Sequence, residues 1–247
     1  MNDGYWAVVK ANVTSAGNER EAALNAWWSH EHVPEYVTLD GFRCAWRVRS
    51  VEAEGQIGTS SHRYYAIYEV DAVSDFNAAL EMGSRSHPGR PWGPWQEYVD
   101  EYVVDWERTY YRVLHREKPT DDAGGFWAIV RANLDFTRPD QEQEFNDWYT
   151  SKHMPEICAY PGIHRAWRLL VEPDDNDLGP RRQRSWGVYQ IDDPSSFAAA
   201  REDRATRGIK PWDGIWLSSV RDFEITFHEV IYDVGKQAAV AAVAARA

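Results

Sequence analysis

Two histidines of this chain stand in the same short motif, Trp-x4-His-x-Pro-Glu. The motif fills residues 27–35 and occurs again at residues 148–156. Histidine transfers protons near neutral pH because its unperturbed pKa is about 6.5. His32 and His153 are therefore the first candidates for general acid–base catalysis.

Side chains that share a helical face with these histidines extend the candidate site. Asn25, Trp28 and His32 are three and four residues apart, which places them on one stripe of a helix. The second copy of the motif places Asn146 and Tyr149 on the matching stripe. We expect the amide to polarise a carbonyl, the aromatic ring to form a wall and the imidazole to move a proton.

A structural interpretation of the same histidines stays open. Pro34 is expected to end the helix, so His32 and His153 would cap the last helical carbonyls. The negative end of the helix dipole would then favour the imidazolium form. In the catalytic interpretation, Glu35 orients the imidazole of His32.

Other candidates lie outside this helix. Trp92 and Trp95 belong to a Pro-rich aromatic loop that would form the wall or lid of an apolar pocket, and His87 just before it has no equivalent in the second copy. Tyr68 and Tyr189 are repeated on a strand and could donate hydrogen bonds to an enolate or phenolate. The alternatives are a loop packed over a sheet edge and ordinary core tyrosines.

Repeated charges and missing motifs narrow the chemistry. Arg47 and Arg168, among other charges repeated on strands, are expected to form ion pairs between two sheets, with anion binding by Arg47 or Arg63 as the alternative. His30 and His32 point about 200° apart on a helix, so they cannot easily share a metal ion. The sequence has no glycine-rich nucleotide motif and no common hydrolase nucleophile motif. We expect neither a metal nor an organic cofactor.

Composition excludes several classes of protein. The 247 residues carry a net charge of −12, which disfavours nucleic acid and anionic lipid as partners. Two cysteines give no disulfide framework, and no apolar run is long enough to cross a membrane. These features predict a cytoplasmic globular protein. Each of the 13 tryptophans aligns with an aromatic residue of the other copy, so most are expected to be structural.

The chain is a tandem duplication. Residues Gly4 to Arg47 align without a gap onto Gly125 to Arg168, at a constant offset of 121. We expect a first domain over residues 1–114, a polar linker over 115–124 and a second domain over 125–235. The Ala-rich residues 236–247 are expected to form a helix that frays in solvent.

Each copy has the pattern strand, helix, strand, strand, helix, strand. In the first copy the strands are expected at Tyr5–Val13, Phe42–Ser50, Arg63–Asp71 and Glu101–Leu114. This order predicts an α+β fold of two ferredoxin-like βαββαβ domains. Helices cover one face of such a sheet, so the other face needs a partner. The second copy supplies that partner, as a pseudo-dimer within the chain.

The repeated His-x-Pro motif resembles the EthD-like branch of the dimeric α/β-barrel superfamily, whose first helix ends in a similar element. The resemblance covers both copies and implies an intramolecular dimeric α/β barrel. Members of the superfamily include cofactor-free monooxygenases, isomerases, cyclases, decarboxylases and haem enzymes, so the resemblance restricts shape more than reaction.

The leading hypothesis is a small-molecule enzyme without an organic cofactor. It would act as a lyase or isomerase on an aromatic or polycyclic carbonyl compound, with histidine acid–base chemistry. A cofactor-free monooxygenase of an electron-rich phenol is the alternative, and a non-catalytic binder of hydrophobic aromatics or a haem protein are others. The expected partner is a small aromatic substrate, and a homodimer is compatible with the sequence.

Overall fold

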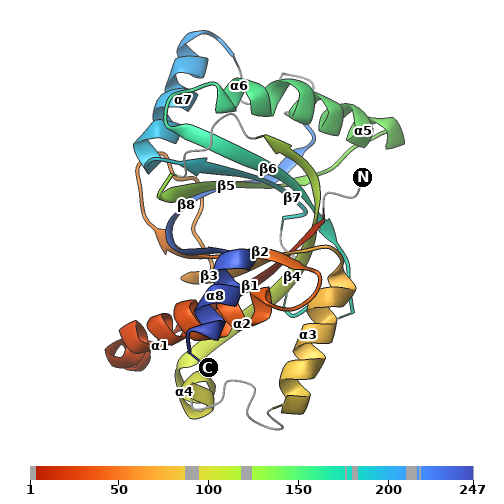
Figure 1. Ribbon diagram of the computed structural model, residues 1–247. Coiled ribbons are helices and arrows are strands. Elements are labelled where there is room, and N and C mark those ends of the chain that lie inside the picture. The colour runs from red at the N-terminus through yellow and green to blue at the C-terminus, as the bar shows by residue number, and fades with distance from the viewer. Residues whose placement is uncertain are drawn as a thin grey trace.

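The computed structural model describes residues 4–86, 95–117, 124–175, 177–179, 183–209, 216 and 218–246. Two halves with the same order of elements face each other across the molecule (Figure 1). His87 and Trp92, two of the candidate residues, lie outside the described residues.

The elements of the first half follow the predicted order, with one additional helix before the last strand. They are β1 (Tyr5–Val13), a 3-10 turn (Ser15–Arg20), α1 (Glu21–Trp27), η2 (Trp28–His32), α2 (Val33–Val37), β2 (Phe42–Val51), β3 (Tyr64–Val70), α3 (Val73–Ser86), α4 (Gln96–Tyr102) and β4 (Val103–Glu117). The elements of the second half are β5 (Phe126–Leu134), α5 (Pro139–Trp148), η4 (Tyr149–His153), α6 (Met154–Cys158), β6 (Ile163–Glu172), β7 (Ser185–Ile191), α7 (Pro194–Thr206), β8 (Val220–Gly235) and α8 (Lys236–Ala244).

The eight strands form one closed barrel in the order β1-β3-β2-β8-β5-β7-β6-β4. All pairs are antiparallel, and the halves are joined edge to edge by β2 with β8 and by β4 with β6. Closure leaves no free strand edge. The fold is therefore the single-chain dimeric α/β barrel that the sequence predicts.

Four tryptophans fill the middle of the barrel. Trp6, Trp46, Trp127 and Trp167 are almost completely buried. Every pair of these rings has a centroid distance between 5.3 and 5.8 Å. Two rings come from each half, and the two from the second half occupy positions equivalent to the two from the first. These tryptophans are structural, as their repetition indicates.

Alternation along β1 separates the barrel interior from the helix-covered face. Trp6 and Val8 point into the barrel, whereas Ala7 and Ala11 pack under the helices of the first half. This is the period of two that the sequence shows over Tyr5–Val13. Each half therefore has its own apolar layer between the sheet and its helices, outside the barrel.

The prediction that Pro34 ends the helix is wrong. The helix runs from Glu21 through Pro34 to Val37, and its middle turn, η2, is a π-helix. Pro34 has no N–H to donate to the carbonyl of His30. That carbonyl instead accepts a hydrogen bond from Arg246 at 2.8 Å. The second half repeats the π turn in η4.

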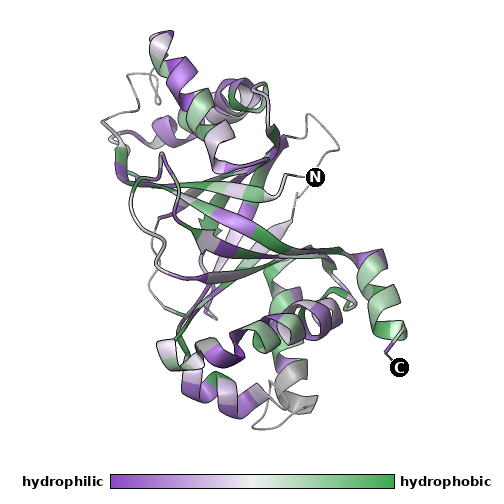
Figure 2. Ribbon diagram, turned by 90° about the vertical axis from the view of Figure 1, so that its left-hand side faces the viewer, coloured by the Kyte–Doolittle hydropathy of each residue, from purple (hydrophilic) through white to green (hydrophobic). Residues whose placement is uncertain are grey.

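The C-terminal helix α8 is docked and does not fray over its described length. Ala239 is fully buried in the apolar layer of the first half. The Lys236 ammonium donates to the Leu39 carbonyl at 2.7 Å, next to α2. Figure 2 shows α8 beside the first half, coloured mostly as hydrophobic. Every residue from Ala238 to Ala244 is alanine or valine, so the side of this helix that meets the first half is apolar. An argument from helix propensity alone does not consider this burial.

Among the described residues, no helix is long and apolar enough to cross a bilayer.

Candidate active site

Each half contains a cavity between its helices and the outer face of its sheet. The volumes are about 310 Å³ in the first half and about 410 Å³ in the second. Equivalent positions line both cavities. In the first they are Val9, Trp28, His32, Tyr36, Tyr68, Phe76, Leu80, Trp106 and Arg108, and their counterparts in the second are Val130, Tyr149, His153, Ile157, Tyr189, Phe197, Arg201, Phe223 and Ile225. The duplicated motif therefore supplies two related candidate sites.

The histidine of each cavity is the last residue of the π turn. His32 stacks near Trp27, with ring centroids 5.0 Å apart, and His153 near Trp148 at 4.9 Å. Burial, assisted by the charge of Arg47, lowers the pKa of His32 to about 3. Burial also lowers the pKa of His153 to about 3, with smaller contributions from nearby arginines. Both imidazoles are therefore neutral at pH 7 and can accept a proton.

The positions of the two histidines contradict the capping interpretation. His32 and His153 lie inside continuous helices, at the start of α2 and α6, and not at helix C-termini. The helix dipole therefore gives them no C-terminal stabilisation of the imidazolium. Desolvation in an aromatic pocket favours the uncharged ring instead.

A tyrosine on the sheet faces each histidine helix. Burial raises the pKa of Tyr68 and that of Tyr189. Both hydroxyls therefore stay protonated and can donate a hydrogen bond to an oxyanion. In the second half the hydroxyls of Tyr149 and Tyr189 are 3.0 Å apart. Trp28 occupies the corresponding place in the first half.

A buried arginine lies behind each aromatic wall. Arg47 and Arg168 are 0% exposed. The guanidinium carbon of Arg47 is 4.4 Å from the ring centre of Trp28, and that of Arg168 is 4.5 Å from Tyr149. Burial lowers the pKa of Arg47 to about 10, still above neutrality. Each site thus has a permanent positive charge behind the ring that lines it.

The expected ion pairs of these arginines between two sheets are absent from the part of the chain that the structure describes. Arg47 donates to the Asn25 carbonyl, to its amide oxygen at 2.6 Å and to the Ser29 hydroxyl at 2.9 Å. Arg168 donates to the Asn146 amide oxygen and to the Ser185 hydroxyl, among other neutral groups. Burying a cation that is held only by neutral groups costs free energy. An anion bound nearby would offset part of that cost.

The two asparagines of the predicted stripe belong to this arginine support. Besides accepting from Arg47, the Asn25 amide donates to the Tyr64 hydroxyl at 3.1 Å. Neither Asn25 nor Asn146 is among the residues that line the two candidate cavities. They position the arginine, and the structure does not bring them to where an oxyanion would sit.

Glu35 and Trp95 also lie away from the cavity of the first half. Glu35 is exposed and is not among the lining residues, so it is not placed to orient His32. Trp95 precedes α4 and contacts Trp27, with ring centroids 5.9 Å apart. Trp95 therefore supports Trp27, the tryptophan beside His32. The sequence analysis expected Trp27 and Trp148 to be structural, yet their rings are the neighbours of the two histidines.

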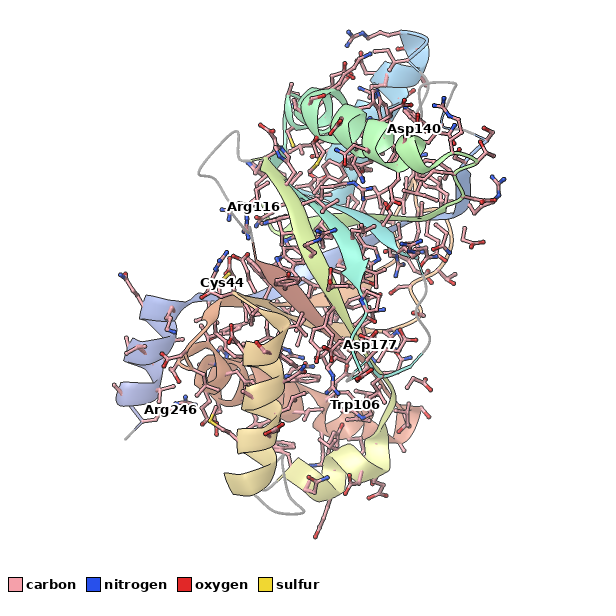
Figure 3. The ribbon with its side chains drawn as sticks, turned by 90° about the vertical axis from the view of Figure 1, so that its right-hand side faces the viewer. Cys44, Trp106, Arg116, Asp140, Asp177 and Arg246 are labelled. Atoms are coloured by element: carbon pink, nitrogen blue, oxygen red, sulfur yellow. The ribbon has the colours of Figure 1, made fainter. Side chains whose placement is uncertain are left out.

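A loop from the opposite half closes each cavity. Leu178, between β6 and β7, lines the first cavity and pairs with Arg108 through two backbone hydrogen bonds of 2.8 and 2.9 Å. Gly55, between β2 and β3, lines the second cavity, and the nearby Ile57 pairs with Ile225 in the same way. Figure 3 shows Trp106 on β4 close to Asp177 of the crossing loop. Neither cavity is complete within its own half.

Gly187 provides a test of this geometry. A Cβ at Gly187 would lie 2.3 Å from the Tyr149 hydroxyl oxygen. In the first half, the position equivalent to Gly187 is Ala66, and the position equivalent to Tyr149 is Trp28. Gly187→Ala should destabilise the protein by about 1–3 kcal/mol and lower its thermal midpoint. Adding Tyr149→Phe, which removes the clashing oxygen, should restore most of the loss. A midpoint that is unchanged in the single variant would contradict the described contact.

Among the described residues, no group of three or more His, Cys, Asp or Glu could hold a metal ion. Such a group would be needed for the metal interpretation of the His30 region.

Comparison with known proteins supports the fold. The sequence matches no protein-family model and no curated protein. A solved structure described as an anthrone oxidase-like protein is similar, with a TM-score of 0.63, 12% identity and 96% of each chain covered. A "putative monooxygenase" from Fusobacterium nucleatum has a TM-score of 0.60, 10% identity and 94% coverage of each chain. A second putative monooxygenase, from Lactobacillus acidophilus, has a TM-score of 0.59 and 9% identity. The match covers 95% of this chain and 97% of that protein's chain. These likenesses establish a dimeric α/β barrel folded from one chain.

Proposed function

We propose that the protein is a cofactor-independent monooxygenase of an electron-rich phenol, within the EthD-like type of dimeric α/β barrel. The similar structures carry the names anthrone oxidase-like protein and monooxygenase, which favours the alternative that the sequence left open. No comparison favours the lyase or isomerase hypothesis. The observation that carries the proposal is a duplicated aromatic cavity lined by a neutral histidine and a tyrosine hydroxyl. Behind its aromatic wall lies a buried arginine that has no carboxylate partner among the described residues.

The first step is removal of the phenolic proton. In the first half, the neutral imidazole of His32 accepts the proton, and the phenolate forms in a cavity whose Trp28 wall has the positive charge of Arg47 behind it. The Tyr68 hydroxyl donates a hydrogen bond to the phenolate oxygen. Imidazolium alone would be unfavourable in this cavity, because burial disfavours it. An anion formed in the same step offsets that cost.

The second step transfers electrons from the substrate anion to dioxygen. A bond forms between oxygen and the ring carbon para to the phenolate, and the resulting hydroperoxide loses water to give a quinone. One oxygen atom ends in the quinone and the other in water, while the ring carbon loses its hydrogen. The substrate supplies all the electrons, so this sequence needs no further reductant.

Oxygen consumption tests this proposal. The purified protein should consume about one mole of O₂ per mole of anthrone or 1-naphthol oxidised, at an unchanged rate after treatment with a metal chelator. Incubation with ¹⁸O₂ should label the product. Turnover of the same compounds under nitrogen would contradict the proposal and indicate a lyase or isomerase. A Soret band in the purified protein would contradict the absence of a cofactor.

A further inference from the structure

We propose that the aromatic residue four positions before each candidate histidine, Trp28 in the first half and Tyr149 in the second, decides whether the tyrosine on the sheet can donate its hydroxyl hydrogen to a substrate oxygen. Trp28 leaves the hydrogen of Tyr68 available, whereas Tyr149 engages the hydrogen of Tyr189. Both are positioning residues, and the first cavity is the stronger binder of a phenolate. The inference rests on the proposed function for the reaction, but its observations concern only the binding of the anion.

The two rings differ in what their polar groups can do. An indole N–H is a hydrogen-bond donor only, whereas a phenolic hydroxyl can donate or accept. Trp28 and Tyr149 line equivalent parts of their cavities. The ring centre of each lies close to the guanidinium carbon of a buried arginine, at 4.4 Å and 4.5 Å. With such similar surroundings, the ring itself determines how the hydrogen bonds are arranged.

In the second half the two tyrosine hydroxyls are hydrogen-bonded to each other. The oxygens of Tyr149 and Tyr189 are 3.0 Å apart, and both side chains are almost completely buried. Burial raises the pKa of both hydroxyls, and their mutual hydrogen bond adds to the rise for Tyr189 and opposes it for Tyr149. These are the effects of a bond in which Tyr189 donates. A substrate oxygen must therefore compete with Tyr149 for that hydrogen.

In the first half Trp28 cannot accept the hydrogen of the sheet tyrosine. Burial raises the pKa of Tyr68, and a hydrogen bond with the Trp28 side chain opposes that rise. This is the effect of an N–H that donates to the tyrosine oxygen. Because the hydroxyl hydrogen of Tyr68 is not engaged by Trp28, it can be donated to a substrate oxygen. A donor that needs no reorientation is the condition for strong stabilisation of an oxyanion.

The strand beneath each ring carries a residue that matches the ring. Ala66 and Gly187 are equivalent, and they pair with Val9 and Val130 on the neighbouring strands β1 and β5. Because a Cβ at Gly187 would meet the hydroxyl oxygen of Tyr149, the tyrosine reaches its partner only over a glycine. The first half has an alanine at this position and a ring without a hydroxyl. An exchange of the two arrangements must therefore change the ring and the strand residue together.

Binding of 4-nitrophenol tests the inference. Its phenolate absorbs visible light, its neutral form is almost colourless, and its ring is too electron-poor for the proposed oxidation. Val130→Phe fills the second cavity so that the first is measured, and Val9→Phe does the reverse, since these valines are equivalent lining residues. Spectrophotometric titration should give phenolate binding about ten-fold tighter in the first cavity, the scale of one hydrogen bond to a charged group. Tyr149→Trp/Gly187→Ala should raise the affinity of the second cavity towards that of the first.

Two phenylalanine variants separate positioning from packing. Tyr149→Phe removes the acceptor that engages Tyr189, so phenolate binding in the second cavity should become tighter. Trp28→Phe removes the N–H that orients the hydroxyl in the first half, so binding there should become weaker. Rings that served only for packing would change the affinity in the same direction in both halves. Tyr160→Phe is the control and should change neither affinity, because Tyr160 donates to Asp203 at 2.6 Å and is not among the residues lining the second cavity.

Weaker phenolate binding in a folded Tyr149→Phe variant, or equal phenolate affinities of the two cavities in the unexchanged chain, would overturn the inference. If Tyr149→Phe does not fold, the exchange Tyr149→Trp/Gly187→Ala decides the question in the same assay, and an affinity that it leaves unchanged is a contrary result. The expected binding pattern without oxygen uptake from any phenol would refute the proposed reaction and leave this inference intact. Oxygen uptake together with either contrary binding result would refute this inference alone.

Discussion

The double variant His32→Ala/His153→Ala should lose catalysed oxygen uptake. A positioned general base contributes about 10²- to 10⁴-fold to a rate, and each cavity has one imidazole among its lining residues. Each single variant should lose the activity of its own half only. With a substrate that uses a single cavity, one single variant should be inactive and the other should match the unmodified protein.

An exposed histidine on the same helix serves as the control. His30 is exposed and is not among the residues lining the first cavity, so His30→Ala should leave oxygen uptake unchanged. Thermal unfolding of every variant identifies losses that arise from misfolding. Full activity of a folded double variant would refute the role assigned to the two histidines.

The pH dependence gives a second measure of the same groups. The pKa of each imidazole is lowered to about 3 from an ordinary value of 6.5, so the active, neutral form persists far below pH 6.5. We expect kcat/KM to show no loss from histidine protonation between pH 5 and 7. Below pH 6.5 the unfolded chain binds protons that the folded chain does not, so folding stability falls as the pH falls towards 3. A kinetic pKa near 6.5 would contradict the described burial.

Replacing Arg47 and Arg168 together by methionine should lower kcat by about ten-fold or more, because each buried charge stabilises an anion in the cavity through space, from behind the ring that forms the wall. The two side chains carry the buried charge nearest to the aromatic walls. Methionine fills a similar volume without charge, and such replacements of buried ions are often tolerated. Because Arg47 contributes to the low pKa of His32, the pKa of that imidazole should also rise, while burial keeps it below 6.5.

The conservative and control variants separate charge from packing. Arg47→Lys keeps the charge and should retain more activity than Arg47→Met. Arg112 on β4 is half-exposed and lies 3.7 Å from Glu172 in a surface ion pair, so Arg112→Met should have no effect on oxygen uptake. If Arg47→Met/Arg168→Met folds and turns over at the unmodified rate, the arginines have only a structural role.

The sequence alone determined the layout of the fold. An ungapped repeat at an offset of 121 requires two copies of one structure, and the alternation in Tyr5–Val13 separates two faces of a sheet. Both signals lie in the local sequence and do not depend on how the two halves are arranged. Helix boundaries were less accurate, because the π turn at residues 28–32 lets the helix continue through Pro34. No local rule predicts that turn from residue types.

The candidate site was only partly accessible to sequence reasoning. His32, Trp28 and Tyr68 do meet in one cavity, since a motif on a helix and a tyrosine on the adjoining strand are brought together by the packing of that helix on the sheet. The role of Arg47 could not be read from its sequence neighbours. Its environment, neutral and fully buried, depends on Asn25 and Ser29 from the helix that packs over it.

Tertiary structure decided how the two halves combine. Their sheets join edge to edge because β2 pairs with β8 and β4 with β6, and the four central tryptophans then fill the barrel. The same closure carries the loop with Leu178 over the first cavity and the loop with Gly55 over the second. Such contacts join residues far apart in the chain, and their free energy depends on shape and burial that no short stretch of sequence contains. The repeat could therefore predict two related sites, but only the folded chain shows that each site is completed by the other half.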